Sequence, residues 1–245
     1  MVMGCQSSEE DESQSEEEDV AVNTLTEAEK EEGWQLLFDG EDPSKHLRGY
    51  CNEAFPDSGW TVEDNALKVI GSGQGEAGGS GGDIITKEKY SNFELELEWK
   101  VEEGGNSGIF YLAEELCDEG EPIWKSAPEF QILDNENHPD AELGEDGNRQ
   151  AASLYDMIPA DPQNTKPYGE WNKVRILVYQ GTVVHFQNGE KVLEYHLWTD
   201  DWKEMVKNSK FNDFGGFADV AKEGYIGLQD HGNDVWFRNI KIRKR

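Results

Sequence analysis

Two short, strand-like segments of this sequence carry side chains that can transfer protons or bind hydroxyl groups. Because side chains alternate along a strand, Glu129 and Gln131 point to the same side of the first segment. Gln229 and His231 do the same in the second segment, near the end of the chain. Polar strand faces are tolerated where water reaches them, so we predict that both faces line one concave groove, which Asn106 joins.

Proton transfer in this groove would depend on His231 and Glu129. His231 is the candidate base, because a neutral imidazole is present near pH 7. Glu129 is the candidate acid, or the base if His231 only binds. Gln131, Gln229 and Asn106 would hold hydroxyl groups or the oxygen of an enolate. Simpler interpretations stay open: Glu129 as a solvated edge residue, and His231 as a turn residue that caps backbone groups.

Lys100, Asp134 and His138 are further candidates for substrate binding. Lys100 could neutralise an enolate, although a surface ion pair is the simpler interpretation. His138 lies in a loop, where a histidine is more often structural than catalytic. The same loop is rich in donors that could hold calcium, although their spacing fits no EF-hand. These donors are Asp134, Asn135, Glu136, His138 and Asp140.

The strand framework is clearest in the segment 93–101. Apolar residues alternate there with glutamates and a lysine, which predicts an antiparallel strand with one buried and one wet face. Asn188-Gly189 and Gln180-Gly181 predict two-residue turns in a three-stranded meander, because such turns need positive φ angles. The segment 225–242 is predicted to be a closing hairpin that turns near Gly232.

Helix signals and the regular spacing of turns complete the fold prediction. Thr26 and Glu29 form a capping box and Gly33 follows, which predicts a short N-terminal helix. A surface helix is predicted at 200–207. Many short strands without a fixed repeat favour an all-β fold, a two-sheet antiparallel jelly-roll sandwich with one or two short peripheral helices. One such domain would span residues 23–245.

The composition limits the classes of partner and chemistry. The net charge of −30 repels phosphate backbones, so nucleic acid is not expected as a partner. No run reaches the roughly 20 apolar residues of a membrane helix. The sequence shows no G-x-S-x-G nucleophile elbow, which needs a strand-to-helix turn, and no HExxH motif, which argues against serine-hydrolase and zinc-protease chemistry, and no cofactor is predicted. The glycine-rich segment 71–82 is predicted to be a mobile loop, because it lacks the context of a phosphate-binding loop.

The N-terminal segment suggests export. Val2-Met3-Gly4-Cys5 resembles the end of a bacterial lipobox, in which the cysteine thiol is acylated. Segment 6–19 is almost wholly Glu, Asp, Ser and Gln, so it should stay extended. Residues 1–22 are therefore predicted to be the lipid-anchored start and disordered tether of an exported bacterial lipoprotein, in the periplasm or at the outer membrane. A disordered tail without an anchor is the alternative. Export would permit a Cys51–Cys117 disulfide.

Four segments within the predicted domain carry a family resemblance. They are Gly105–Phe110, Pro128–Asn135, Gly169–Asn172 and Gly224–Gly232, the last running into Trp236–Ile240. Trp34–Gly40 and Leu154–Asp156 match as well. Taken in order, these segments resemble the 3-keto-disaccharide hydrolase family over nearly the whole domain. The resemblance implies a concanavalin A-like jelly roll and action on glycosides whose glucose C3 hydroxyl has been oxidised to a ketone. It also fits export, but it assigns no catalytic role to any position.

The implied substrate defines two chemical routes. A ketone at C3 acidifies the proton on C2, so a base can remove it while donors stabilise the enolate and an acid protonates the departing glycosidic oxygen. This is β-elimination, with water added later. Direct hydrolysis needs two carboxyl groups that flank the bond. The predicted function is cleavage of 3-keto-glycosides by one of these routes. The alternatives are a non-catalytic carbohydrate-binding module on the same fold and an envelope protein that binds partners through its acidic tail.

Overall fold

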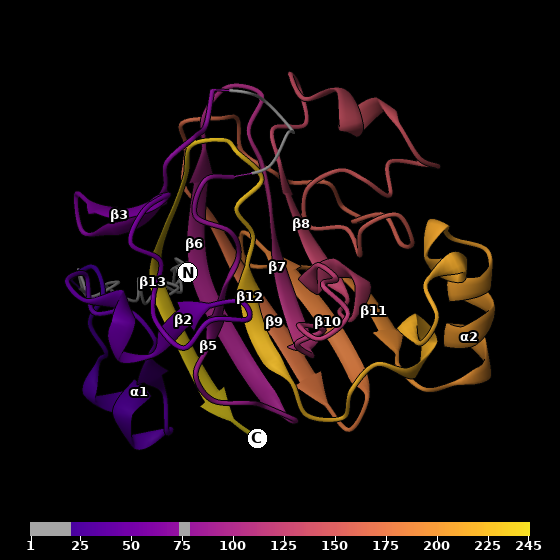
Figure 1. Ribbon diagram of the computed structural model, residues 1–245, viewed down its shortest axis with the longest axis horizontal. Helices are drawn as coiled ribbons and strands as arrows, with labels where there is room; N and C mark the ends of the chain where they lie inside the picture. Colours follow the sequence, from indigo (N-terminus) through magenta and orange to yellow (C-terminus); the bar gives the residue numbers. More distant parts are fainter. Residues whose placement is uncertain (1–20, 74–78) are drawn as a thin grey trace, which may run out of the picture.

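The computed structural model describes residues 21–73 and 79–245, which form two antiparallel β-sheets packed face to face (Figure 1). The predicted fold class, an all-β two-sheet sandwich with short peripheral helices, is confirmed. The predicted lipidation site Cys5 and the predicted acidic tether lie outside the described residues. Within the described ranges, no helix is both long enough and apolar enough to cross a membrane.

The larger sheet has eight strands. They are β1 (Gln35–Leu36), β3 (Trp60–Glu63), β4 (Ala66–Val69), β6 (Phe93–Val101), β9 (Asn172–Tyr179), β10 (Thr182–Gln187), β11 (Glu190–His196) and β13 (Val235–Lys244). Seven of them lie in the order β11-β10-β9-β6-β13-β4-β3, and β1 pairs with β13. The predicted meander is β9, β10 and β11, and all four residues of its two turns have positive φ angles, as predicted.

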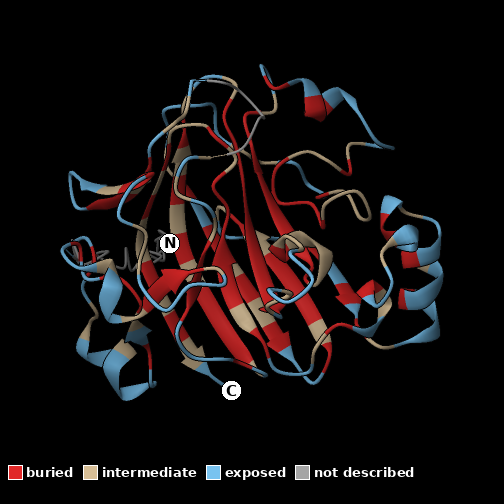
Figure 2. Ribbon diagram, viewed as in Figure 1, coloured by how far each residue is buried: buried red, intermediate tan, exposed pale blue. Residues whose placement is uncertain are grey.

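The smaller sheet has five strands and carries the residues of interest. They are β2 (Leu47–Gly49), β5 (Ile84–Thr86), β7 (Asn106–Ala113), β8 (Glu129–Leu133) and β12 (Tyr225–Leu228). Their order is β2-β5-β12-β7-β8. Ile109, Phe130 and Ile132 face the larger sheet and are fully buried in the core between the layers. Figure 2 shows that the strands of both sheets are mostly buried. The alternate residues Gly108 and Gln131, paired across β7 and β8, therefore point to the opposite, outer face.

The helices lie at the edges of the sandwich (Figure 1). α1 (Glu27–Glu31) begins at Thr26 with the predicted capping box, and α2 (Asp200–Lys207) begins at Thr199, whose hydroxyl accepts from the Trp202 amide. The Trp202 side chain packs into the main core. Short 3-10 turns are η1 (Pro43–Lys45), η2 (Ile123–Lys125), η3 (Pro139–Glu142), η4 (Lys210–Asp213) and η5 (Phe217–Asp219).

The predicted closing hairpin is wrong. β12 belongs to the five-stranded sheet and β13 to the eight-stranded sheet, so the two strands do not pair. The turn near Gly232 exists, but it carries the chain from one layer to the other. Hydrogen bonds anchor both ends of this crossing. At one end the Gly81 amide donates to the Asp230 carboxylate, and at the other the Asp234 amide donates to the Glu102 carboxylate. A two-residue periodicity predicts which side chains of a strand are buried, but it does not predict which sheet the strand joins.

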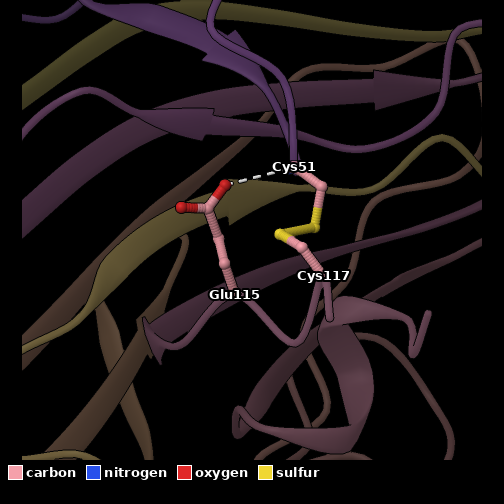
Figure 3. Close-up of side chains that lie close together, drawn as sticks. All are labelled: Cys51, Glu115 and Cys117. Atoms are coloured by element: carbon pink, nitrogen blue, oxygen red, sulfur yellow. Dashed lines mark hydrogen bonds between the residues drawn. A yellow bond between two sulfur atoms is a disulfide. The ribbon is translucent and has the colours of Figure 1, made fainter. Parts of the chain in front are cut away.

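One disulfide joins two loops beside the smaller sheet. Cys51 and Cys117, 66 residues apart in the chain, are bonded with their Cα atoms 5.6 Å apart (Figure 3). The pairing that export would permit is therefore present in the structure.

Candidate active site

A pocket of about 430 Å³ lies over the outer face of the five-stranded sheet, where loops cover β7, β8 and β12. Carboxylates, amides, one histidine, one lysine and several aromatic rings line it. The lining residues are Asp83, Asn106, Trp124, Glu129, Gln131, Tyr155, Lys210, Phe211, Phe214, Gln229, Asp230 and His231. A cavity of this size suits a small-molecule ligand.

The pocket brings together the residues whose meeting was predicted from strand alternation. Strands β7, β8 and β12 are adjacent, so their outward side chains share one surface. The expectation of an open, wet face is only partly met, because the covering loops leave little of these side chains exposed. The predicted residues that line the pocket are Glu129, Gln131, Gln229, His231 and Asn106.

Glu129 is the most unusual of these side chains. Its residue is 7% exposed, and no described residue gives its carboxyl group a hydrogen bond. The carboxyl group lies over Gly108, where an added Cβ would be 2.2 Å from Glu129 Oε1. Burial raises the pKa of Glu129 to about 8, although the positive charge of Lys210 opposes the shift. The raised pKa favours the protonated form of Glu129, which can donate a hydrogen bond.

Asp83 and Asp230 lie across β12 and β7 from the buried glutamate. Asp230 Oδ2 accepts hydrogen bonds from the amides of Gly81 and Gly82, at 2.9 and 3.1 Å. It fills the space that a side chain on Gly79 would need, so the end of the glycine-rich segment shapes this part of the pocket. The Asp230 amide donates to Asp83 Oδ1 over 2.9 Å. Burial nevertheless raises the pKa of Asp83 to about 7, which suits proton transfer near neutral pH.

Lys210 supplies a positive charge beside the buried glutamate. Its Nζ lies 3.9 Å from the centroid of the Tyr155 ring. Tyr155 Oη donates to Asp140 Oδ2 over 2.8 Å, and Arg149 bridges Asp140 and Asp156 at 2.9 and 2.6 Å. This network fixes the ring on which the ammonium group rests. Desolvation lowers the pKa of Lys210, although the nearby carboxyl groups oppose the shift.

Three buried polar atoms of the pocket have no hydrogen-bond partner in the described part of the chain. They are Asn106 Oδ1, Gln229 Oε1 and His231 Nδ1. Leaving such an atom unpaired costs about 1–3 kcal/mol, so a native structure keeps it for a reason. Amide oxygens accept hydrogen bonds, and an unprotonated imidazole nitrogen does too. The pocket is therefore suited to a ligand rich in hydroxyl groups.

Aromatic side chains form one wall. The ring centroids of Trp124 and Phe214 lie 5.2 Å apart, and those of Phe211 and Phe214 lie 5.9 Å apart. Such surfaces can contact the C–H faces of a sugar ring.

Asp134 and His138 lie outside the pocket and serve the loop in which they stand. Asp134 Oδ2 accepts from the Gly104 amide over 2.8 Å, and His138 Nδ1 accepts from the Asp140 amide over 3.1 Å. The loop considered for calcium uses its other oxygens in a similar way, since Asn135 Oδ1 accepts from a backbone amide. These contacts give both predicted binding residues a structural function.

Lys100 also lies outside the pocket. It is on β6 of the eight-stranded sheet, and its Nζ lies 5.1 and 4.6 Å from the ring centroids of Trp171 and Trp236. The ion pair that Glu98 makes is with Arg238, at 2.7 Å. Lys100 thus faces aromatic rings on the other layer of the sandwich.

Strand patterns did not reveal four polar residues of the pocket: Asp83, Asp230, Tyr155 and Lys210. Tyr155 and Asp230 fall within segments of the family resemblance, which was the available signal. Lys210 follows a surface helix and Asp83 follows a run of glycines, and neither context marks a site.

The family is decided by comparison over the whole fold. A family model described as the 3-keto-alpha-glucoside-1,2-lyase-like domain matches residues 33–243. The chain belongs to this family. A 3-keto-disaccharide hydrolase of Bacteroides thetaiotaomicron is 55% identical, with 86% of this chain and 78% of that protein covered.

Two crystal structures from Parabacteroides distasonis, both provisionally assigned to the glycosyl hydrolases, share the fold of this family member. One has a TM-score of 0.80 at 31% identity, with 92% of this chain and 100% of that chain covered. The other has a TM-score of 0.67 at 27% identity, with 86% and 99% covered.

Proposed function

We propose that this protein is a glycoside-cleaving enzyme that acts on 3-keto-glucosides, including 3-keto-disaccharides. One observation carries the proposal: unpaired hydrogen-bond acceptors and a buried carboxyl group with a raised pKa meet in a single pocket. The acceptors suit the hydroxyl groups of a sugar, and the carboxyl group suits a carbonyl oxygen. Family membership and the name of the Bacteroides thetaiotaomicron relative support the same substrate class.

We infer that cleavage occurs by elimination. His231 takes the proton from C2 of the keto sugar, and the negative charge collects on the C3 oxygen. Glu129 and Lys210 stabilise this oxygen, one by a hydrogen bond and the other by its charge. The electron pair then forms the C1–C2 double bond while the C1–oxygen bond breaks, and Asp83 gives a proton to the leaving oxygen. The products are an unsaturated keto sugar and an alcohol, and addition of water to the double bond makes the net reaction a hydrolysis.

This division of tasks moves the leaving-group proton from Glu129, where sequence reasoning assigned it, to Asp83. Glu129 lies beside the cation Lys210, as a group that stabilises an oxyanion should. Asp83 lies at the opposite side of the pocket, with its pKa raised to about 7. The second carboxyl group therefore becomes the acid.

The test is incubation of the protein with a 3-keto-disaccharide in D2O, followed by NMR of the released sugars. Elimination and rehydration place deuterium on C2 of the released keto sugar, whereas direct hydrolysis leaves protium there. The free keto sugar in the same buffer controls for spontaneous exchange. His231→Ala should lower kcat by about 10²–10⁴-fold. Binding without release of any sugar would identify a carbohydrate-binding module and end the enzymatic proposal.

We propose likewise that the protein is exported and anchored by a lipid on Cys5. The Cys51–Cys117 disulfide supports an oxidising compartment, and the sequence around Cys5 supports acylation. In a bacterial host, the protein should fractionate with membranes and carry a diacylglyceryl mass on Cys5. Cys5→Ala should lack that mass, and an unmodified Cys5 in the parent protein would refute the anchor.

A further inference from the structure

A second pocket, of about 480 Å³, adjoins the first one. Asp83 lines both pockets. Loops 49–56 and 117–122 form most of its wall, and the backbone of Gly81 and Gly82 forms the rest. The amides of these two glycines also hold a carboxylate of the first pocket, so the same stretch of backbone borders both hollows. A ligand longer than one ring could occupy both pockets by passing Asp83.

The second pocket presents flat apolar surfaces in fixed positions. Tyr50, Pro56 and Pro122 line it. Tyr50 Oη accepts from the Leu116 amide over 2.8 Å and donates to the Glu121 carbonyl over 3.1 Å, so its ring is held in place. Surfaces of this kind suit the C–H face of a sugar ring.

The two pockets differ in charge. Lys210 and His231 line the first pocket, whereas no lysine, arginine or histidine among the described residues lines the second. Asp83 and Glu121 line the second pocket instead. Glu121 is already paired with Lys125, at 2.5 Å, so the described lining offers a carboxylate or phosphate group no free cation. The second pocket therefore favours an uncharged ligand.

The loops of the second pocket are fixed before any ligand binds. The Cys51–Cys117 disulfide ties one loop to the other, and Glu115 accepts a hydrogen bond from the Cys51 amide over 2.9 Å (Figure 3). Glu115 in turn receives two hydrogen bonds from Arg48, at 2.7 and 2.8 Å. Both sulfur atoms are used in the disulfide, so this group is a clamp for the loops rather than a thiolate metal site. A preformed wall lowers the entropy cost of binding.

We propose that the second pocket is the subsite for the leaving group, and that it takes an uncharged sugar ring. The inference rests on the proposed function, with the keto ring in the first pocket. The bond to be cleaved then lies at the junction, where Asp83 can protonate the departing oxygen. Binding energy from the second ring would be used to orient the bond for cleavage.

The test compares kcat/KM for a 3-keto-disaccharide with that for the corresponding methyl 3-keto-glucoside. Glu121→Trp and Asn52→Trp place a large ring in the second pocket from opposite walls. Each should lower the ratio of disaccharide to methyl glycoside activity by about tenfold. Glu119→Trp and Glu53→Trp make the same change at exposed neighbours and should keep the parent ratio. A disaccharide with a carboxylate on its leaving ring should be cleaved more slowly than the neutral one.

The outcomes separate the two proposals. Cleavage of neither substrate by the parent protein would refute the proposed function. Cleavage of both, with the parent ratio kept in folded Glu121→Trp and Asn52→Trp, would refute the leaving-group subsite alone. Equal rates for the neutral and carboxylated disaccharides would refute the preference for an uncharged ring. Thermal melting of each variant shows whether it is folded.

Discussion

Glu94 on the eight-stranded sheet and Glu129 on the five-stranded sheet are both nearly buried, at 2% and 7% exposure. Each points outward from its own sheet. Burial acts to raise the pKa of Glu94, but hydrogen bonds and charges from Arg243, Arg245 and Arg175 outweigh it, and the pKa is lowered. Glu129 makes no hydrogen bond to an arginine or lysine of the described chain, and burial outweighs the charge of Lys210 and raises the pKa of Glu129 to about 8. The environment thus favours the ionised form of a glutamate in the large sheet and the protonated form of a glutamate in the small sheet.

The difference shows that pairing, rather than burial, distinguishes the outer face of the large sheet from the face of the small sheet that carries the pocket. Along the outer side of the large sheet, Glu98 pairs with Arg238 at 2.7 Å and Glu96 with Lys241 at 3.1 Å. In the pocket of the small sheet, three amide or imidazole atoms lack hydrogen-bond partners within the described residues. Unpaired polar groups are costly, and they are kept where a ligand completes them.

The largest expected contrast is in catalysis. Glu129→Gln removes the acidic proton while keeping the shape, and it should lower kcat/KM for a 3-keto-disaccharide by about 10²–10³-fold. Glu94→Gln, a matched change of an equally buried glutamate, should leave kcat/KM within about twofold once the fraction of folded protein is taken into account. Steady-state kinetics on both variants measures this. Similar losses in the two variants would mean that Glu129 has no special part in the reaction.

The next effect tests the position of the Glu129 carboxyl group. Gly108→Ala adds a Cβ 2.2 Å from Glu129 Oε1, so the carboxyl group must move. Displacement of a reacting group by about 1 Å can cost about 10²-fold, and we expect kcat/KM to fall by about tenfold or more. Gly215→Ala, where an added Cβ meets nothing within 4 Å, is the control. Parent-like rates in Gly108→Ala would show that the position of the carboxyl group over Gly108 is unimportant.

For the free energy of unfolding, the order of the two glutamates should reverse, so that the substitution at Glu94 is the damaging one. Glu94→Gln breaks charged hydrogen bonds to three arginines and should lower the free energy of unfolding by about 2 kcal/mol. Glu129→Leu replaces an unpaired polar group and should raise it by up to about 1 kcal/mol. Urea denaturation gives both values. A loss in Glu129→Leu as large as that in Glu94→Gln would reveal stabilising contacts of Glu129 in solution.

The smallest effect is a pH dependence of opposite sign at the two glutamates. The folded-state pKa of Glu129 lies above its ordinary value of 4.5, so its contribution to stability is full below pH 4.5 and is lost as pH rises towards 8. Glu129→Gln should therefore gain a few degrees of melting temperature relative to the parent between pH 5 and 8. The pKa of Glu94 is lowered, so its contribution is lost as pH falls, and the deficit of Glu94→Gln should shrink below pH 4.5. Parallel melting curves at all pH values would contradict both shifts.

The local structure of the site could be predicted from the sequence better than the set of residues that form the site. β6 lies at its predicted bounds, and alternation placed Glu129 and Gln131 of β8 outward as observed. Alternation could not tell which sheet a strand joins, which is why Lys100 was considered for the site and β12 was paired with β13. Long-range contacts decide both questions.

The covering loops could not be predicted for a different reason. Lys210 and Tyr155 reach the pocket from separate loops, which are positioned by ion pairs such as that of Arg149 with Asp156. A loop has no periodic pattern that fixes the direction of its side chains. The family resemblance led to the proposed substrate class, which physical patterns alone did not indicate.

The position of β13 has a consequence for how the chain folds. This strand is the last in sequence, yet it lies inside the larger sheet, between β6 and β4, and also pairs with β1. Until β13 docks, the larger sheet consists of two separate pieces, each with an open edge. One piece is β3 with β4, and the other is made of β6, β9, β10 and β11. The two pieces are joined by pairings as distant as Gln35 with Ile242. Late docking of such a strand makes folding slow and leaves hydrogen-bonding edges exposed during synthesis, so the nascent chain should depend on chaperones until β13 emerges.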